Sequence, residues 1–227
     1  MSTVAERTHC KRASYQAGLL GGFTMIAAAL LVMGNIATRD TIEMRRAEDL
    51  LASLDQVIPA SIHDNDLLAN PLDLPLASGE TLTVYRARKE SEVTGVAYPL
   101  SAQGYGGSID LILGLNADGK ILGVRALAHA ETPGLGDKID VSRDDWIQGF
   151  DGLSLDNPPA ERWAVKKDGG DFDQFSGATI TPRAVVGSVK KGLELFRENK
   201  DALLASAVIQ ESPTRRPASN RDSGSRP

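Results

Sequence analysis

A run of small residues ending in a threonine hydroxyl is the segment of this chain best suited to chemistry. It occupies residues 173–179 and closes with Ser176, Gly177, Ala178 and Thr179. Because these side chains are small, a bulky ligand can approach the backbone closely, and Gly177 permits the positive φ that an exposed tight loop commonly needs. The pattern predicts an accessible loop that presents the Thr179 hydroxyl.

A helix is predicted immediately after this loop, with Thr181 as its N-cap and Pro182 as its first residue. Helical spacing then continues through Val185, Val189, Gly192 and Phe196. Thr179 would therefore stand just before a helix N-terminus, where unpaired N–H groups and the macrodipole favour a negatively charged group. The alternative is a small-residue loop before an ordinary capped helix.

Residues 173–179 resemble the flavinylation motif D-x-x-(S/T)-G-A-(T/S). In proteins with that motif, a flavin transferase joins the phosphate of FMN to the final hydroxyl, which here belongs to Thr179. The resemblance implies a covalent phosphoester, which the spacing alone does not show. It also implies that Ser176 through Thr181 form the attachment loop.

Composition excludes several other classes of site. The chain has 25 Lys and Arg against 30 Asp and Glu, without a basic stripe, so no nucleic-acid partner is expected. The lone cysteine, Cys10, cannot supply an iron–sulfur cluster or a thiolate zinc site from this chain alone. His9, His63 and His129 lack metal-ligand spacing. Redox chemistry here would need an organic cofactor.

Residues 13–37 are nearly free of charge and supply the roughly 20 apolar residues that a membrane-spanning helix needs. A cleaved signal peptide is the rival, but its apolar region is typically about 7–15 residues and ends at a small-residue site. This run is longer and no convincing A-x-A site follows, which favours a retained anchor over a signal peptide or a buried helix. Basic residues do not set its orientation, since equal numbers flank it: Arg7, Lys11 and Arg12 before, Arg39, Arg45 and Arg46 after.

Apolar periodicity beyond the span predicts an amphipathic helix over 42–58, stopped by Pro59, and then an irregular connection over 64–79. Alternating runs predict strands over 81–88, 92–99, 108–115 and 120–129, with a hairpin turn at 116–119.

Further on, Ser142 is expected to cap a short helix that contains Trp146 and Phe150. Residues 161–166 are expected to form another strand, closed by a turn at 168–170. Together these elements predict an α+β, antiparallel-strand domain on a single N-terminal transmembrane helix. The expected division is an N-terminal segment (1–12), a transmembrane helix (13–37), a membrane-proximal helix and connection (38–79), the covalent FMN-binding domain that the motif resemblance implies (80–210) and a disordered tail (211–227). The family resemblance described next implies that residues 1–12 are a cytoplasmic N-terminus.

Three further segments extend the resemblance: 104–109 (G-Y-G-G-S-I), 129–138 (H-A-E-T-P-G-L-G-D-K) and 163–170 (W-A-V-K-K-D-G-G). With the flavinylation motif, and over the chain from the anchor to about residue 208, they resemble the G subunit of the Rnf electron transport complex. The related C subunit of the sodium-pumping quinone reductase shares E-T-P-G-L-G and the S-G-A-T site. It carries G-x-G-L-W where this chain has Gly104-Tyr105-Gly106-Gly107, a departure that favours the Rnf family.

The resemblance implies an electron-relay subunit in the bacterial inner membrane, with a single pass and its flavin domain on the periplasmic side. Its partners would be the other Rnf subunits and a flavin transferase. The complex couples electron flow between ferredoxin and NAD to sodium or proton movement, while this subunit neither binds NAD nor moves the ion. No stand-alone catalysis is expected. The rival functions are a membrane-anchored covalent-FMN redox sensor and a scaffolding subunit whose motif is never modified.

The resemblance also suggests non-covalent flavin contacts. Glu131, Thr132, Leu135 and Gly136 lie in a rigid turn where Thr132 would bond a flavin edge and Leu135 would cover a face. The alternative there is an ordinary Pro-Gly turn with an exposed glutamate. Lys166 is the preferred counter-charge for phosphate, against a solvated Lys166-Lys167 pair at a strand end.

Three other candidates receive structural interpretations. The glycines of 104–107 lack dinucleotide-site spacing and predict a bend before a strand. Trp146 and Trp163 are expected in the core in preference to stacking on a ring, since aromatic burial dominates small cores. For His129, a hydrogen-bonding core residue is the favoured interpretation over a proton donor or a surface group.

Overall fold

The computed structural model describes residues 3–76 and 79–205. The chain forms two compact units, the first ending at Gln56 and the second beginning at Val57. The predicted tail over 211–227, and the last residues assigned to the FMN-binding domain, lie outside the described part of the chain.

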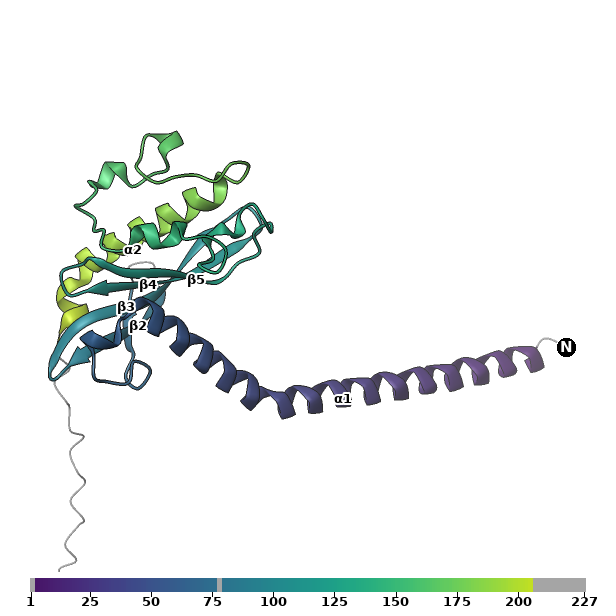
Figure 1. Cartoon of the computed structure of the whole chain (residues 1–227). Coiled ribbons are helices and arrows are strands. Elements are labelled where there is room, and N and C mark those ends of the chain that lie inside the picture. Colours follow the sequence, from purple (N-terminus) through teal and green to yellow (C-terminus); the bar gives the residue numbers. More distant parts are fainter. Residues whose placement is uncertain (1–2, 77–78, 206–227) are drawn as a thin grey trace, which may run out of the picture. The chain divides into compact units, whose positions relative to one another are not determined.

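The first unit belongs to one long helix, α1 (Thr3–Val57), drawn from purple to blue in Figure 1. Its stretch Tyr15–Ile36 is 22 residues of exposed apolar surface, long enough to cross a membrane once. The Thr24 and Thr38 hydroxyls donate to the carbonyls of Leu20 and Gly34, at 3.1 and 2.8 Å. Each of these two polar side chains is thus satisfied within the helix, as an apolar surrounding requires. The separate helix predicted over 42–58 is the continuation of α1, which ends two residues before Pro59.

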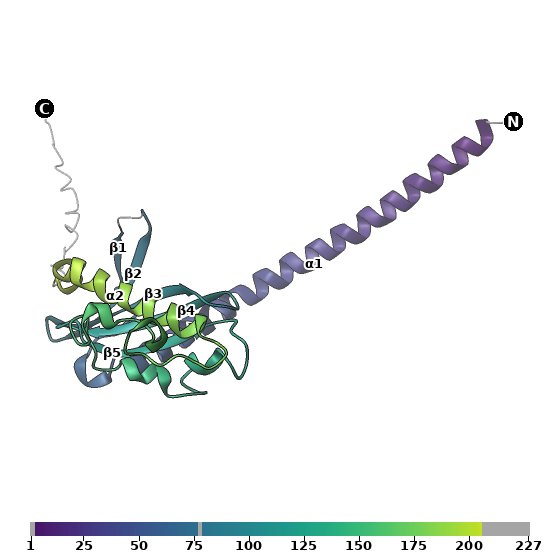
Figure 2. The same cartoon turned by 90° about the horizontal axis from the view of Figure 1, so that it is seen from above.

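A five-stranded antiparallel sheet forms the second unit, with its strands in chain order. The strands are β1 (Leu72–Pro75), β2 (Thr81–Lys89), β3 (Glu92–Gln103), β4 (Ser108–Asn116) and β5 (Ile121–Ala128). β1 and β2 reach out from the rest of the sheet as a hairpin (Figure 2). In β4 the residues from Leu111 to Leu115 are all buried, so both faces of this strand are covered.

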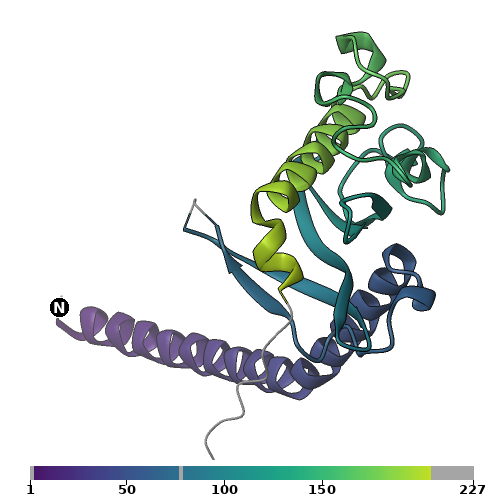
Figure 3. The same cartoon turned by 90° about the vertical axis from the view of Figure 1, so that its left-hand side faces the viewer.

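One face of the sheet is covered by α2 (Ile180–Leu204), which packs mainly along β3 (Figure 3). Gly192 allows the close approach, because a Cβ there would lie 2.7 Å from Leu113 and 2.8 Å from Leu100. The buried Tyr98 hydroxyl donates to the Gly192 carbonyl at 2.8 Å, and its burial raises the pKa of that phenol. Helix and sheet are therefore held by apolar contact and by this buried hydrogen bond.

The opposite face of the sheet packs on the segment that follows Gln56. The Val57 carbonyl lies against Gly114, where an added Cβ would come within 2.2 Å of it. Ile62, in the 3-10 helix η1 (Ala60–Ile62), contacts the sheet at Gly95. The sheet is thus the middle layer of the second unit.

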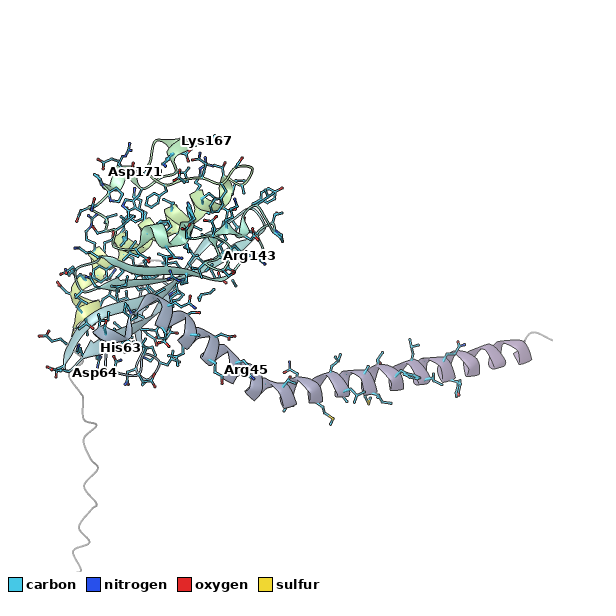
Figure 4. All side chains as sticks on the ribbon, in the orientation of Figure 1. Arg45, His63, Asp64, Arg143, Lys167 and Asp171 are labelled. Carbon is cyan, nitrogen blue, oxygen red and sulfur yellow. The ribbon has the colours of Figure 1, made fainter. Side chains whose placement is uncertain are left out.

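Between β5 and α2 the chain winds through four short 3-10 helices: η2 (Asp137–Ile139), η3 (Trp146–Phe150), η4 (Ala160–Arg162) and η5 (Lys166–Asp168). This segment gathers beyond the N-terminal half of α2 (Figure 3), with Lys167 and Asp171 on its side away from the sheet (Figure 4). Its own core is aromatic, with stacked or edge-on rings 4.9–6.1 Å apart from Trp146, Phe150, Trp163, Phe172 and Phe175. Trp163 is buried and Trp146 packs against this cluster, so the core assignment of both tryptophans is confirmed.

The α+β class and the antiparallel sheet are confirmed, and the four predicted strands correspond to β2 to β5. Three local predictions are wrong: the irregular connection over 64–79, the helix cap at Ser142 and the strand over 161–166.

The connection over 64–79 contains β1, which pairs with β2. Ser142 does not cap a helix; its N–H donates to the Asp140 carboxylate in a turn, and η3 begins after Asp145.

Residues 161–166 do not form the predicted strand, because Arg162 folds back on its own segment. Its guanidinium donates to the Gly169 carbonyl at 3.1 Å and pairs with Asp171. In this part of the described chain, the strand-like pairing consists of one isolated bridge, between Val165 and Phe172.

Candidate functional site

A cavity of about 330 Å³ lies where three segments distant in sequence converge at the start of α2. The segments are the β3–β4 loop, the loop after β5 and the end of the flavinylation-like motif. Its wall is formed by Tyr105, Glu131, Thr132, Leu135, Gly136, Gly177, Ala178, Thr179, Ile180 and Thr181. The structure thus brings together the E-T-P-G-L-G and S-G-A-T segments, including most of the residues predicted for the site.

Glu131 connects these segments. Its side chain is only 5% exposed, and its Oε1 accepts the Gly106 N–H at 2.8 Å from the β3–β4 loop. Its Oε2 accepts the Thr181 hydroxyl from the first turn of α2. The alternative of an exposed glutamate in an ordinary turn is therefore wrong, and Glu131 ties three segments together.

Glycines provide the space for this carboxylate. A Cβ at Gly104 would lie 2.3 Å from Oε1 of Glu131, and one at Gly136 would lie 2.8 Å from Oε2. At Gly106 a Cβ would lie 2.0 Å from the Ala130 carbonyl oxygen. Gly104 and Gly136 are thus fitted to the buried Glu131 side chain, and Gly106 is fitted to the backbone beside it. The predicted bend at 104–107 has this packing reason.

Thr181 does not cap α2. It lies inside the first turn, fully buried, and its hydroxyl is used by Glu131. Pro182 is the third residue of the helix, where the missing N–H is still one of the unpaired donors of a helix start. The N-cap expectation is wrong because the cross-link to Glu131 takes the hydroxyl that a cap would need.

Thr179 itself occupies the N-cap position, with helical φ of −66° and ψ of −25°. It is half-buried, and its hydroxyl makes no capping hydrogen bond. In the described part of the chain, the N–H groups of Thr179, Ile180 and Thr181 donate to no backbone carbonyl. A cavity-facing segment with a helix start and an uncommitted hydroxyl is therefore suited to an anionic group.

The first half of the motif is anchored. Phe175 is 7% exposed and packs edge-on against Trp146, with ring centroids 5.0 Å apart. The Asp173 carbonyl accepts the Trp146 indole N–H at 2.9 Å. Gln174 accepts the Lys167 N–H through its side chain, at 3.2 Å. These contacts fix the base of the loop whose tip is Ser176 and Gly177, the latter with the predicted positive φ of 81°.

Lys166 is not one of the residues that form the cavity wall. Its Nζ pairs with Oδ1 of Asp173 at 2.6 Å, both side chains being more than half exposed. Among the described residues, the cavity wall contains neither lysine nor arginine. Lys166 thus braces the motif from outside, and its role as a phosphate counter-charge stays a prediction.

The outer wall of the cavity is apolar and open to solvent. Tyr105, Leu135 and Ile180 are 74%, 43% and 47% exposed. The Leu135 side chain lies 3.6 Å from where a Gly177 Cβ would be, so it adjoins the motif loop directly. Tyr105 was not predicted as a wall residue, and a tyrosine within a glycine-rich loop was the only signal for it. Ile180 lies within the predicted attachment loop from Ser176 to Thr181, although it was not singled out as a contact.

Comparison with known proteins bears on the same segments. Residues 104–194 match the FMN-binding domain family, a region that starts at the β3–β4 loop and includes the whole cavity wall. A relative from Cereibacter sphaeroides, named as the G subunit of an ion-translocating oxidoreductase complex, is 52% identical over 85% of this chain and 88% of its own length. The chain belongs to this G-subunit family.

Relatives of the same name from other bacteria agree. The relative from Stutzerimonas stutzeri is 50% identical over 81% of each chain, and that from Shewanella oneidensis is 41% identical over 86% of this chain and 94% of its own. The resemblance drawn from the motifs is confirmed, and this member of the G-subunit family is an electron-transfer subunit with an FMN-binding domain.

Two solved structures are similar to part of this chain. NqrC of Shewanella oneidensis has a TM-score of 0.44 at 23% identity, covering 66% of this chain and 73% of its own. The C subunit of the Na(+)-translocating NADH-quinone reductase from Parabacteroides distasonis has a TM-score of 0.41 at 21% identity, covering 55% of this chain and 65% of its own.

Proposed function

We propose that this subunit relays electrons within a membrane-bound, ion-translocating ferredoxin:NAD oxidoreductase complex, and that it carries FMN joined through its phosphate to Oγ1 of Thr179. The relatives' name supports an ion-translocating oxidoreductase complex, and the family match supports FMN. Ferredoxin and NAD as the redox partners of the complex come from the motif resemblance to the Rnf family. The main support is that Thr179 lies in the wall of a cavity that the E-T-P-G-L-G turn also lines, and that its hydroxyl makes no capping hydrogen bond.

The residues of the cavity fit such a group. About 330 Å³ lies at the lower end of the range typical for small-molecule sites, and the open mouth leaves part of a ligand exposed. Tyr105, Leu135 and Ile180 provide apolar surface for a flat ring. The unpaired N–H groups at the start of α2 suit a phosphate next to Thr179.

Each part of the wall has a separate task in this proposal. When bound, FMN supplies the electron-accepting and electron-donating chemistry. Thr179 holds the phosphate end, Leu135 and Ile180 limit access of water to one side, and Thr132 offers a hydroxyl at the edge, while its carbonyl accepts the N–H groups of Leu135 and Gly136 within the turn. Gly177, Ala178 and Gly136 keep the backbone close to the group, while Ser176 stands at the exposed tip that a flavin transferase would reach.

Covalent attachment suits an electron relay, because the cofactor is retained through many turnovers even though the cavity is open. The exposed wall also leaves the electron-carrying ring close to solvent, where neighbouring subunits can dock. The other subunits of the complex would be its electron donors and acceptors, and a flavin transferase its maturation partner.

The attachment is tested by intact mass of the full chain, coexpressed with a flavin transferase and purified in detergent. Thr179→Ala should lose the FMN adduct completely, while its free energy of unfolding changes by no more than about 0.5 kcal/mol. Thr179→Ser should retain some adduct, since the oxygen survives. Thr132→Ala is the matched control, a threonine in the same cavity wall that should keep the adduct. An adduct on Thr179→Ala would refute the acceptor assignment.

We further propose that α1 anchors the chain in the bacterial inner membrane with the FMN-binding domain on the periplasmic side. Support comes from the apolar stretch Tyr15–Ile36 and from the relatives' membership of an ion-translocating complex. Cys10, the single cysteine, would then be cytoplasmic. A membrane-impermeant thiol reagent should leave it unlabelled in intact cells and label it after lysis. Labelling of Cys10 in intact cells would show that the chain has the opposite orientation in the membrane.

A further inference from the structure

Glu131 places a buried negative charge in the wall of the cavity. It is 5% exposed, and both of its carboxylate oxygens accept hydrogen bonds from neutral donors, the Gly106 N–H and the Thr181 hydroxyl. Two glycines, Gly104 and Gly136, leave room for these oxygens, since a Cβ at either position would lie within 2.8 Å of one of them. The fold thus holds one carboxylate at a fixed point of the wall.

In the described part of the chain, no ion pair includes Glu131, and the ion pairs of the second unit lie elsewhere. The described cavity wall contains no lysine or arginine. An uncompensated charge in a poorly solvated wall acts strongly on any other charge that appears in the cavity.

We infer that Glu131 lowers the reduction potential of the flavin carried in this cavity. Two-electron reduction of FMN with uptake of one proton adds one negative charge to the ring. In the complex these electrons come from a neighbouring redox centre. The Glu131 carboxylate opposes that added charge, so the site holds electrons less tightly and passes them on more readily. The inference rests on the proposed FMN site and adds a residue that sets its potential.

A purely structural role for Glu131 predicts something different. As a cross-link between the β3–β4 loop, the turn after β5 and α2, it needs hydrogen-bonding atoms of the right shape but no charge. Glutamine has that shape. Its Oε1 can accept the Gly106 N–H, and its amide can donate to the Thr181 oxygen. Glu131→Gln therefore removes the charge and keeps the connection, whereas Glu131→Asp keeps a carboxylate and shortens the reach.

The test is a dithionite titration of the full chain in detergent, purified after coexpression with a flavin transferase, with the midpoint potential read from flavin absorbance. Glu131→Gln should shift the equilibrium at least tenfold toward reduced flavin, a rise of about 30 mV for a two-electron couple. Glu131→Asp should stay near the potential of the unmodified sequence. The control is Glu194→Gln on α2, which lies about 20 Å along the helix from Ile180 and should leave the potential unchanged.

The outcomes separate this inference from the proposed function. Absence of an FMN adduct on the unaltered chain would refute the proposed attachment. With the adduct present, equal potentials for the unaltered chain and Glu131→Gln would overturn the role of the charge. Equal shifts for Glu131→Gln and Glu131→Asp would overturn it too, because they would trace the effect to lost contacts. Loss of the adduct or of folding in Glu131→Gln alone would likewise count against it, since it would show that the cross-link itself requires the charge.

Discussion

The two halves of segment 173–179 are held in opposite ways. The first half is fixed by its surroundings, with Phe175 in the aromatic cluster and Asp173 bonded to Trp146 and Lys166. In the second half, the tip at Ser176 and Gly177 is exposed, while Ala178 and Thr179 are half-buried. Anchoring and presentation are thus separate tasks within one short motif. Substitutions in the first half should act on stability, and substitutions in the second half on modification.

Phe175→Ala should give the largest loss of stability. Removal of a buried phenylalanine costs about 3–5 kcal/mol in free energy of unfolding, because it deletes ring contacts and leaves a cavity. Chemical denaturation of the full chain in detergent measures this change. Tyr105→Ala is the control, an aromatic residue 74% exposed on the same cavity, and should change stability by about 0.5 kcal/mol or less. Similar losses for both would remove the distinction between anchored and presented regions.

Thr181→Ala should come next. It leaves Oε2 of Glu131 buried without its donor, which costs about 1–3 kcal/mol. The FMN adduct should persist, because Thr179 is untouched, and Thr181→Ser should recover most of the stability. Denaturation and intact mass of the same samples check both points. A Thr181→Ala protein that lacks the adduct but keeps full stability would show that Thr181 acts in modification instead.

Gly136→Ala tests the space around Glu131 with a single methyl group. The new Cβ would lie 2.8 Å from Oε2 of Glu131 and 2.9 Å from Oγ1 of Thr181. Because φ at Gly136 is −88°, crowding and not backbone strain causes the expected loss of about 1–3 kcal/mol. Gly149→Ala is the matched control, since nothing lies within 4 Å of its Cβ position. A neutral Gly136→Ala would mean that Glu131 can move aside.

The smallest effect concerns the ion pair between Asp168 and Arg183, which joins η5 to the first turn of α2 with an Nε–Oδ2 distance of 2.6 Å. The hydrogen bond from Arg183 lowers the pKa of Asp168. A depressed folded pKa contributes stability above the unfolded value, near 3.9, and that contribution is lost as the pH falls through the folded value. Both groups are exposed, so the effect is small.

Denaturation at pH 7 and pH 3 measures this contribution. Asp168→Asn should lower stability slightly at pH 7 and should reduce the difference between the two pH values. If Asp168→Asn left the difference in stability between pH 7 and pH 3 unchanged, the ion pair would contribute nothing to stability.

Local patterns in the sequence predicted the elements, and long-range contacts decided the site. Patterns within single runs of sequence located β2 to β5, each of which pairs with its neighbour in the chain. The helix face from Val185 to Phe196 was also predictable from local sequence, because its period is that of the helix itself. Motif resemblance predicted that Thr179 and the E-T-P-G-L-G turn share one site, and the structure places both in the wall of the same cavity. The true role of Thr181 was hidden, because its partner Glu131 lies 50 residues away and no local pattern marks that pairing.

The order in which parts of the domain fold follows from how far apart in sequence their contacts lie. The five strands join through hairpins between consecutive neighbours, so the sheet needs only short loops to close. The Thr181–Glu131 and Tyr98–Gly192 bonds close loops of 50 and 94 residues and require α2 to have docked. The cavity around Thr179 therefore forms only when the domain has folded.

A flavin transferase that recognises this cavity would act only on folded chains. If Thr179 carries FMN as proposed, the attached flavin would mark a correctly folded domain.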